Sequence, residues 1–265
     1  MDDGAELTRD RFLRGSDRGA LWISQPRRGY RAGVDPVLLA ASVPAKPGQS
    51  LLDLGCGVGT AALCAGWRVP GLRLAGLERQ ADHAALAARN AAENGLEMEV
   101  VTGDLTRMPD ALRQRQFDHV IANPPYFRRD ASTRATVPAR EAAMGEETPM
   151  AAWVAAAARR CAPGGTVTFI QRVERLPEIL AGFTAHLGSI ELKPLLPREG
   201  RESQLFLIRA RKNGRAAFRL HAGLLLHSGA EHGQDRPDYS DLAEAILKTG
   251  AILPFDGGPK KDPVG

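Results

Sequence analysis

The sequence predicts an α/β fold with a doubly wound, mostly parallel sheet of seven strands and an antiparallel edge strand. Short apolar runs alternate with alanine-rich stretches between residues 50 and 210, as in β-α-β units with right-handed crossovers. A glycine-rich turn follows the first run, and acidic residues lie near the ends of the first three. Because open α/β sheets bind ligands at the carboxyl ends of their strands, these features predict a ligand site at that edge.

Seven apolar segments have the character of buried strands. They are expected at residues 50–54, 72–77, 97–101, 119–122, 166–170, 190–192 and 204–208. The segment between the last two strands leaves little room for a helix, which predicts that these strands form the antiparallel edge. Alanine-rich helices are expected at residues 81–94 and 150–161, and a third helix at 173–186.

Outside this core the elements are shorter. A strand is expected at residues 21–26, and a helix at 35–42, where an Asp-Pro pair gives a helix start. Two more short strands are expected at residues 217–221 and 224–227, and a helix at 239–248 that glycine stops.

The domain organisation follows from this order of elements. Residues 1–20 are polar and charged and are expected to form a mobile arm. A single domain is expected over residues 21–255, with its core at about 49–211 and a C-terminal β/α extension at about 212–255. The tail, residues 256–265, is expected to be disordered.

Composition limits the environment and the partners. The three cysteines lack the spacing of a metal site and favour a reduced, cytoplasmic environment, and the six histidines show no ligand spacing, so no metal is expected. No apolar run reaches membrane-spanning length, so no membrane association is expected, and the acidic start does not resemble a signal peptide. The net charge of +4 and the clustered arginines favour an anionic partner.

The glycine-rich turn has three glycines, Gly55, Gly57 and Gly59, and lets a ligand approach the backbone just before a helix begins. A dinucleotide site is the main alternative, but its fingerprint requires a glycine where this chain has Thr60. Asp53 precedes the turn. A carboxylate there is unfavourable beside a pyrophosphate but suits a ligand that carries an ammonium group and a positive sulfur.

Acidic residues also mark the ends of the next two strands. Glu78 lies roughly twenty residues beyond the glycine turn, the spacing at which a carboxylate binds ribose hydroxyls. Gly103 and Asp104 end the following strand, where the carboxylate could accept a hydrogen bond from an adenine amino group. Each acidic residue alone is typical of a loop, but the three together with the glycine turn predict a nucleoside-bearing ligand.

The tetrapeptide Asn123-Pro124-Pro125-Tyr126 follows the fourth strand. Two prolines fix the backbone and remove two N–H donors, which leaves carbonyls free to accept from a ligand, and Asn123 adds a side-chain oxygen. Two convergent acceptors suit a planar amino group, and Tyr126 offers a ring for stacking. The alternative is an ordinary turn, since Asn-Pro is a common turn start.

In this order and spacing, the motifs resemble those of class I S-adenosylmethionine-dependent methyltransferases, which have a Rossmann-like sheet. The Asn-Pro-Pro-Tyr form is similar to the branch that methylates planar amino groups, namely adenine N6 in nucleic acids and a glutamine amide in release factors. The resemblance implies S-adenosylmethionine as methyl donor, with S-adenosylhomocysteine as product. It also implies a cosubstrate site formed by Asp53, the glycine turn, Glu78, Gly103 and Asp104. The implied catalytic residues are Asn123, Pro124, Pro125 and Tyr126.

Residues 29–41 and 220–247 resemble the bacterial valine-tRNA adenine-N6 methyltransferases, which act on the adenine beside the anticodon. This resemblance implies tRNA as the RNA partner and adds Gly33 and Asp35 to the expected cosubstrate site. Arg128, Arg129 and Arg134 follow the tetrapeptide, where they are expected to hold RNA phosphates. The sequence leaves open whether the protein is a monomer or a homodimer.

Other functions stay open. A protein glutamine methyltransferase uses the same tetrapeptide, but it typically carries a longer helical region than the 49 residues that precede Ser50 here. A methyltransferase for guanine N2 in ribosomal RNA commonly has phenylalanine in place of Tyr126. A DNA adenine methyltransferase would normally need a separate recognition domain, for which this chain has no room. A non-catalytic RNA-binding protein would not need both motifs intact.

Overall fold

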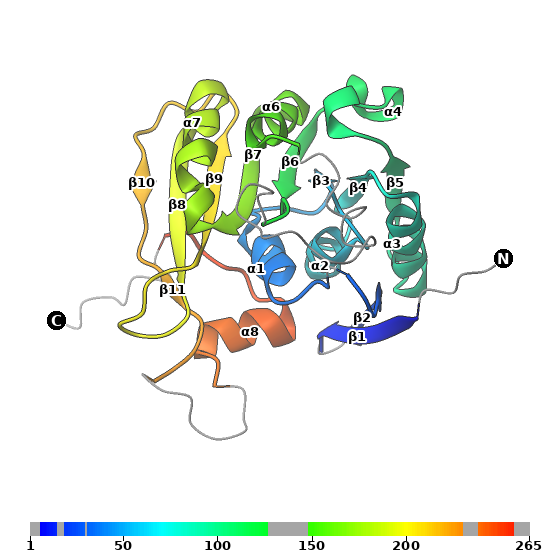
Figure 1. Ribbon diagram of the computed structural model, residues 1–265, viewed down its shortest axis with the longest axis horizontal. Helices are drawn as coiled ribbons and strands as arrows, with labels where there is room; N and C mark the ends of the chain where they lie inside the picture. The colour runs from blue at the N-terminus through cyan, green and yellow to red at the C-terminus, as the bar shows by residue number, and fades with distance from the viewer. Residues whose placement is uncertain (1–5, 15–18, 30, 127–147, 230–237, 257–265) are drawn as a thin grey trace, which may run out of the picture.

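The computed structural model describes residues 6–14, 19–29, 31–126, 148–229 and 238–256. They form a nine-stranded sheet with helices on both faces and a separate two-stranded sheet (Figure 1). In chain order the large sheet contains β3 (Ser50–Leu54), β4 (Arg73–Glu78), β5 (Met98–Thr102), β6 (Phe117–Ala122), β7 (Cys161–Arg172), β8 (Gly188–Leu196), β9 (Leu205–Arg211), β10 (Arg219–Leu220) and β11 (Leu224–Leu225).

The strand order across the sheet is β10-β8-β9-β7-β6-β3-β4-β5, and β11 also pairs with β8. The seven predicted core strands are confirmed, and β3, β4, β5, β6 and β7 are parallel. The antiparallel strand is β9, which lies between β7 and β8 rather than at the margin. The sheet is wider than predicted because the two short C-terminal strands pair in parallel with the outer side of β8.

The predicted helices form, with ends shifted by at most a few residues. In chain order the helices are α1 (Asp35–Ser42), α2 (Thr60–Arg68), α3 (Ala81–Glu93), η1 (Leu105–Arg107), α4 (Asp110–Arg113), α6 (Met150–Arg160), η3 (Val173–Arg175), α7 (Leu176–His186) and α8 (Asp241–Thr249). The last of these begins where the Ser240 hydroxyl accepts from the Ala243 N–H, and it ends at Gly250, whose φ is 66°. None of the described helices is long and apolar enough to cross a membrane.

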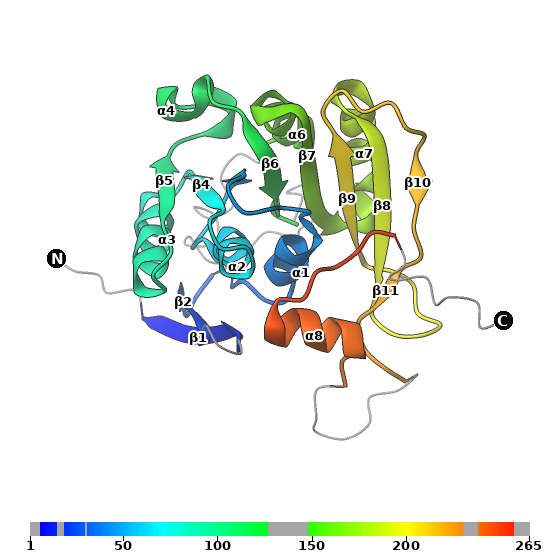
Figure 2. The same cartoon turned by 180° about the vertical axis from the view of Figure 1, so that it is seen from behind.

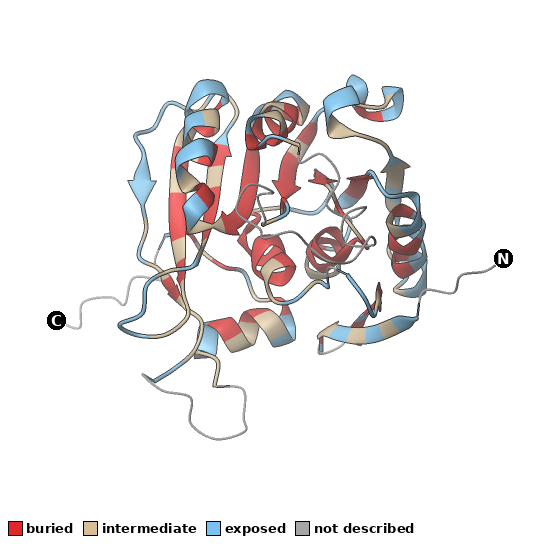
Figure 3. Ribbon diagram, viewed as in Figure 1, coloured by how far each residue is buried: buried red, intermediate tan, exposed pale blue. Residues whose placement is uncertain are grey.

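Two hydrophobic cores lie on opposite faces of the large sheet, because side chains alternate along each strand. On β3, Leu51 points into one core and Leu52 into the other. The first core contains side chains of α1, α2, α3 and α8, and the second contains those of α4, α6 and α7. Buried residues therefore fill the central strands, whereas the outer faces of the helices are exposed (Figure 3).

The prediction of a mobile arm is wrong for residues 7–13. They form β1 (Leu7–Leu13), which pairs antiparallel with β2 (Leu21–Pro26) beside α8 and α2 (Figure 2). Two asparagines hold this hairpin: Asn90 of α3 and Asn94, which directly follows that helix, exchange hydrogen bonds with the backbones of Ser24 and Trp22. Leu13, Leu21 and Ile23 of the hairpin are also buried in the first core, so apolar packing and these distant hydrogen bonds together anchor it. The predicted disordered tail lies, apart from Asp256, outside the described residues.

Candidate active site

The carboxyl ends of four parallel strands meet at one edge of the sheet. β3 lies between β4 and β6, so that Leu54 is paired with both Leu77 and Ala122. β5 is paired with β4 up to Glu78. The glycine turn, Glu78, Gly103-Asp104 and the tetrapeptide each follow or end one of these strands, so the topology brings the predicted motifs together.

The turn requires glycine because its backbone has positive φ angles and because Gly55 packs closely against Trp153. Gly55 has a φ of 67°, and a Cβ there would lie 2.5 Å from Cη2 of Trp153. Gly59 has a φ of 89° and precedes the first turn of α2. Gly57 also has a positive φ, 55°, but a Cβ there would point into open space. The outer side of the turn is therefore accessible to a ligand, whereas its inner side packs against the protein.

Glu78 fixes this turn. Its Oε2 accepts from the Gly57 N–H at 2.9 Å, and its Oε1 accepts from the Gln80 N–H at 2.8 Å. The residue is 7% exposed. Each carboxylate oxygen has a further lone pair, so the predicted bond to ribose hydroxyls stays a prediction beside this structural role.

Asp53 is a buried carboxyl behind the same turn. It is 2% exposed, and its Oδ2 accepts from the Ala62 N–H at 3.3 Å. Burial raises the pKa of Asp53 to about 8, and the negative charge of Glu78 contributes to the rise, although the Ala62 hydrogen bond opposes it. At neutral pH the carboxyl is therefore mostly protonated in the absence of a cation.

Asp104 has a local structural role. Its Oδ1 accepts from both the backbone N–H and the hydroxyl of Thr106, each at 2.8 Å, and so caps η1. The backbone bond is the main cause of its lowered pKa. Both bonds use the same carboxylate oxygen. Gly103 is required by packing, because a Cβ there would lie 2.3 Å from Cγ of Pro109. The adenine contact stays a prediction.

The tetrapeptide is held at two points. The Pro124 carbonyl accepts from Nε2 of Gln171 at 3.0 Å, and the Tyr126 hydroxyl donates to Oδ2 of Asp35 at 2.5 Å. Pro124 is buried, Asn123 and Tyr126 are half-buried, and Pro125 is exposed. The tyrosine ring is therefore fixed from its hydroxyl end.

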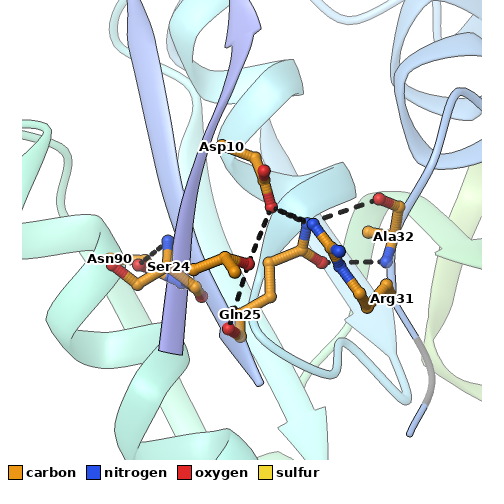
Figure 4. Close-up of polar contacts among 7 residues, drawn as sticks. Asp10, Ser24, Gln25, Arg31, Ala32 and Asn90 are labelled. Atoms are coloured by element: carbon orange, nitrogen blue, oxygen red, sulfur yellow. Dashed lines mark hydrogen bonds and ion pairs between the residues drawn. The ribbon is translucent and has the colours of Figure 1, made fainter. Parts of the chain in front are cut away.

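Asp35 begins α1, and in the structure it contacts the tetrapeptide. The chain before it is tied to the hairpin: the Gln25 side chain bonds both backbone groups of Ala32, and Asp10 accepts from Gln25 and Arg31 (Figure 4). Gly33 is exposed, and a Cβ there would meet nothing. The predicted contacts of Gly33 and Asp35 with a cosubstrate stay predictions.

Three residues of this region were not predicted from the sequence. Gln171 holds the Pro124 carbonyl, Trp153 packs under Gly55, and Asn90 donates to the Val58 carbonyl within the glycine turn at 2.9 Å. No local signal identifies them, because each is an ordinary residue of a strand or helix whose partner lies far away in the sequence.

The predicted phosphate contacts at Arg128, Arg129 and Arg134 lie outside the described residues. Within the described part of the chain, no group of three or more histidine, cysteine, aspartate or glutamate side chains is placed to hold a metal ion.

This arrangement is typical of methyltransferases, and residues 32–181 match the model of the methyltransferase small domain family. The chain belongs to that family. It is 30% identical over 129 residues to the tRNA1(Val) (adenine(37)-N6)-methyltransferase of Yersinia enterocolitica, an overlap of 47% of this chain and 51% of that protein. The protein of the same description from Shewanella halifaxensis is 32% identical over 107 residues, which are 40% of this chain and 43% of that one. The chain thus spans about half the length of the curated relatives it matches.

Solved structures show the same fold. A predicted O-methyltransferase from Agrobacterium tumefaciens has a TM-score of 0.68 and 25% identity, and the overlap covers 83% of this chain and 98% of that one. The 16S rRNA N2 G1207 methyltransferase of T. thermophilus, solved with AdoMet and guanosine, has a TM-score of 0.53 and 18% identity, covering 78% and 51%. At this identity the second likeness concerns the fold alone. Together they establish the Rossmann-like methyltransferase sheet.

Proposed function

We propose that this chain transfers a methyl group from S-adenosylmethionine to the exocyclic N6 of an adenine in RNA, specifically an anticodon-loop adenine of a valine tRNA. The single observation that carries the proposal is the meeting of the glycine turn and the Asn-Pro-Pro-Tyr tetrapeptide at the ends of adjacent strands, β3 and β6. The names of the relatives support the choice of tRNA adenine.

The residues at the glycine turn fit S-adenosylmethionine. When bound, this molecule supplies a methyl group on a positively charged sulfur, and it carries an ammonium group and an adenosine. The buried carboxyl of Asp53 suits a cation. Burial disfavours its ionised form, and a positive charge beside it would stabilise that form. The open space at Gly57 leaves room for a ligand against the backbone, and Glu78 and Asp104 offer oxygen acceptors.

The tetrapeptide would act on the acceptor. The lone pair of an adenine amino group is delocalised into the ring, which makes the nitrogen a poor nucleophile. If Asn123 Oδ1 and the Pro124 carbonyl each accept one N–H, the nitrogen becomes pyramidal and its lone pair is aimed in line at the methyl group. The orientation of the lone pair toward the methyl group lowers the barrier, and the two acceptor dipoles stabilise the developing positive charge. The methylated nitrogen loses its proton after transfer, so no general base is needed before it.

Tyr126 would hold the base itself. Its ring is fixed by the hydroxyl bond to Asp35 at 2.5 Å, which leaves the ring as a stacking surface beside Asn123. A base must leave its stack before an enzyme can reach its amino group, and aromatic rings commonly receive such a base. A fixed ring reduces the loss of side-chain entropy when the base binds.

The exposed face of the hairpin offers a surface for the rest of the RNA. The guanidinium groups of Arg9 and Arg11 lie 5.5 Å and 5.8 Å from the ring centre of Trp22, which is 36% exposed. Among the described residues, no carboxylate pairs with either arginine. Two cations beside an exposed indole suit phosphates and a stacked base.

Replacing Arg9 and Arg11 together by alanine is expected to weaken tRNA binding about 10-fold and to reduce the salt dependence of binding by about two phosphate contacts. Filter binding over a range of salt concentrations measures both quantities. Arg113→Ala is the matched control. This exposed arginine belongs to α4, which covers the opposite face of the large sheet from the hairpin, and it pairs with Asp110. Equal salt slopes for the double variant and the wild type would show that the hairpin arginines do not contact the RNA phosphates.

Replacing Glu78 by alanine is expected to weaken S-adenosylmethionine binding by at least about 10-fold, since the change frees two backbone N–H groups and removes the proposed ribose acceptor. Glu78→Gln keeps one acceptor and should lose less. Titration calorimetry measures the affinities, and Glu93→Ala on the exposed end of α3 is the control. An unchanged affinity of the alanine variant would contradict both roles.

The test of the function is mass spectrometry of tRNA nucleosides from a strain that lacks this protein, joined to methyl transfer by the purified protein. Loss of N6-methyladenosine from valine tRNA, restored by the purified protein, is the expected result. Methyl transfer to guanine or to a glutamine amide would replace the proposal with one of those substrates. Binding of S-adenosylmethionine without transfer to any RNA would also overturn it.

A further inference from the structure

Gln171 occupies a special place in the sheet. It is fully buried near the carboxyl end of β7, which continues beyond the end of β6 (Figure 1). The last recorded pair between these strands joins Ala122 to Phe169. Continuing that register by two residues places Gln171 opposite Pro124. The side chain therefore lies at the position where the next backbone pairing between the two strands would be.

Backbone pairing cannot continue there, because neither Pro124 nor Pro125 has an N–H. The carbonyl of Pro124 is outside any strand or helix, and the Gln171 side chain supplies the donor that the strand ladder cannot, with Nε2 at 3.0 Å from the oxygen. A carbonyl oxygen has two lone pairs. The bond from Gln171 uses one of them and leaves the second for another donor.

The orientation of the Gln171 amide follows from its neighbours. Its Oε1 accepts from the Arg172 N–H at 2.9 Å, and a backbone N–H can only donate. The opposite end of the amide must then be the NH2 group, which faces the Pro124 carbonyl. The donor is also neutral, so it places no positive charge beside a nitrogen that becomes positive during methyl transfer.

We propose that Gln171 is a positioning residue for methyl transfer, because its side-chain amide orients the Pro124 carbonyl toward the acceptor amino group. This inference rests on the proposed function of the tetrapeptide. Gln171 does not itself touch the acceptor: it acts through the carbonyl. Its loss should therefore reduce the rate of the transfer step and leave the binding of both substrates nearly unchanged.

Gln171→Glu tests this directly, because it keeps the shape and the oxygen that faces Arg172 but replaces the donor with a carboxylate oxygen. The expected result is a kcat about 10- to 100-fold lower, with the KM for tRNA and the S-adenosylmethionine affinity within about twofold of wild type. Burial raises the pKa of a carboxyl, and a protonated carboxyl donates again. The kcat of the variant relative to wild type should therefore recover as the pH falls from about 8 to about 6.

Gln171→Leu has no donor at any pH and should lose kcat without recovery, which keeps the proposal testable if the glutamate variant folds poorly. Thr168→Val is the matched control: Thr168 is fully buried in the same strand, and its hydroxyl has no hydrogen-bond partner in the described part of the chain. Thermal unfolding checks that each variant is folded.

The outcomes separate the two proposals. Wild-type protein that methylates no amino group would overturn the proposed function and this inference with it. Active wild-type protein together with an unchanged kcat in Gln171→Leu, a loss confined to KM, or no recovery of Gln171→Glu at low pH would overturn the role of Gln171 alone.

Discussion

Replacing Asn123 by alanine is expected to lower kcat for methyl transfer by about 100- to 1,000-fold, while the affinity for S-adenosylmethionine stays within about twofold. The side-chain oxygen is one of the two acceptors proposed for the amino hydrogens, and without it the amino group stays planar with its lone pair delocalised into the ring. Asn123 follows β6 and is not part of the glycine turn. Single-turnover transfer to tRNA and titration calorimetry measure the two effects separately.

Asn123→Asp is the informative companion variant, because it keeps an acceptor oxygen of the same reach. It should retain much more activity than the alanine variant, whereas a purely structural role would make both changes equally harmful. Retention of most of the transfer rate by Asn123→Ala would show that the tetrapeptide is an ordinary strand-ending turn, the alternative that the sequence alone leaves open.

The parts predicted from sequence are those that depend on local patterns. Apolar runs predicted the positions of β3 to β9. The spacing of three glycines predicted the glycine turn, since the backbone there has positive φ values of 67°, 55° and 89° that favour glycine. The gathering of Asp53, Glu78 and Asn123 at one edge followed from the parallel order of their strands. None of these inferences needed a contact between distant side chains.

The parts that were missed depend on such contacts. β1 carries three consecutive charged residues, Arg9, Asp10 and Arg11, and has no apolar stripe. Its partner strand β2 is held by Asn90 and Asn94, which lie 66 and 72 residues from Ser24 and Trp22 in sequence. Likewise, Gln171 lies 47 residues from Pro124, and Asp35 lies 91 residues from Tyr126. Pairing of this kind depends on the strand order and register, which single residues do not encode.

Asp53 connects the stability of the protein to its proposed ligand. Its pKa in the folded protein is about 8, raised from 3.8, so the folded state binds a proton that the unfolded chain releases at lower pH. The stability contributed by this group is therefore full below about pH 4 and is lost as the pH rises toward about 8. Asp53→Asn removes the titrating group and should raise the melting temperature relative to wild type at pH 8 but not at pH 4.

Ligand binding should show the opposite preference. A cation beside Asp53 favours the carboxylate, so S-adenosylmethionine should bind more tightly as the pH rises from about 5.5 to about 7.5, and about one proton should be released per ligand. Within this range the ligand's ammonium group stays mostly protonated. Titration calorimetry in two buffers of different ionisation enthalpy counts the released protons.

The asparagine variant completes the test, because it cannot become negative. It should bind S-adenosylmethionine at least about 30-fold more weakly than wild type at pH 7.5, and its affinity should no longer depend on pH through this site. Greater thermal stability together with weaker binding would show that a buried carboxyl is retained for the ligand at a cost in stability. Wild-type affinity in Asp53→Asn, or binding without proton release, would mean that the positive charge of the ligand lies elsewhere.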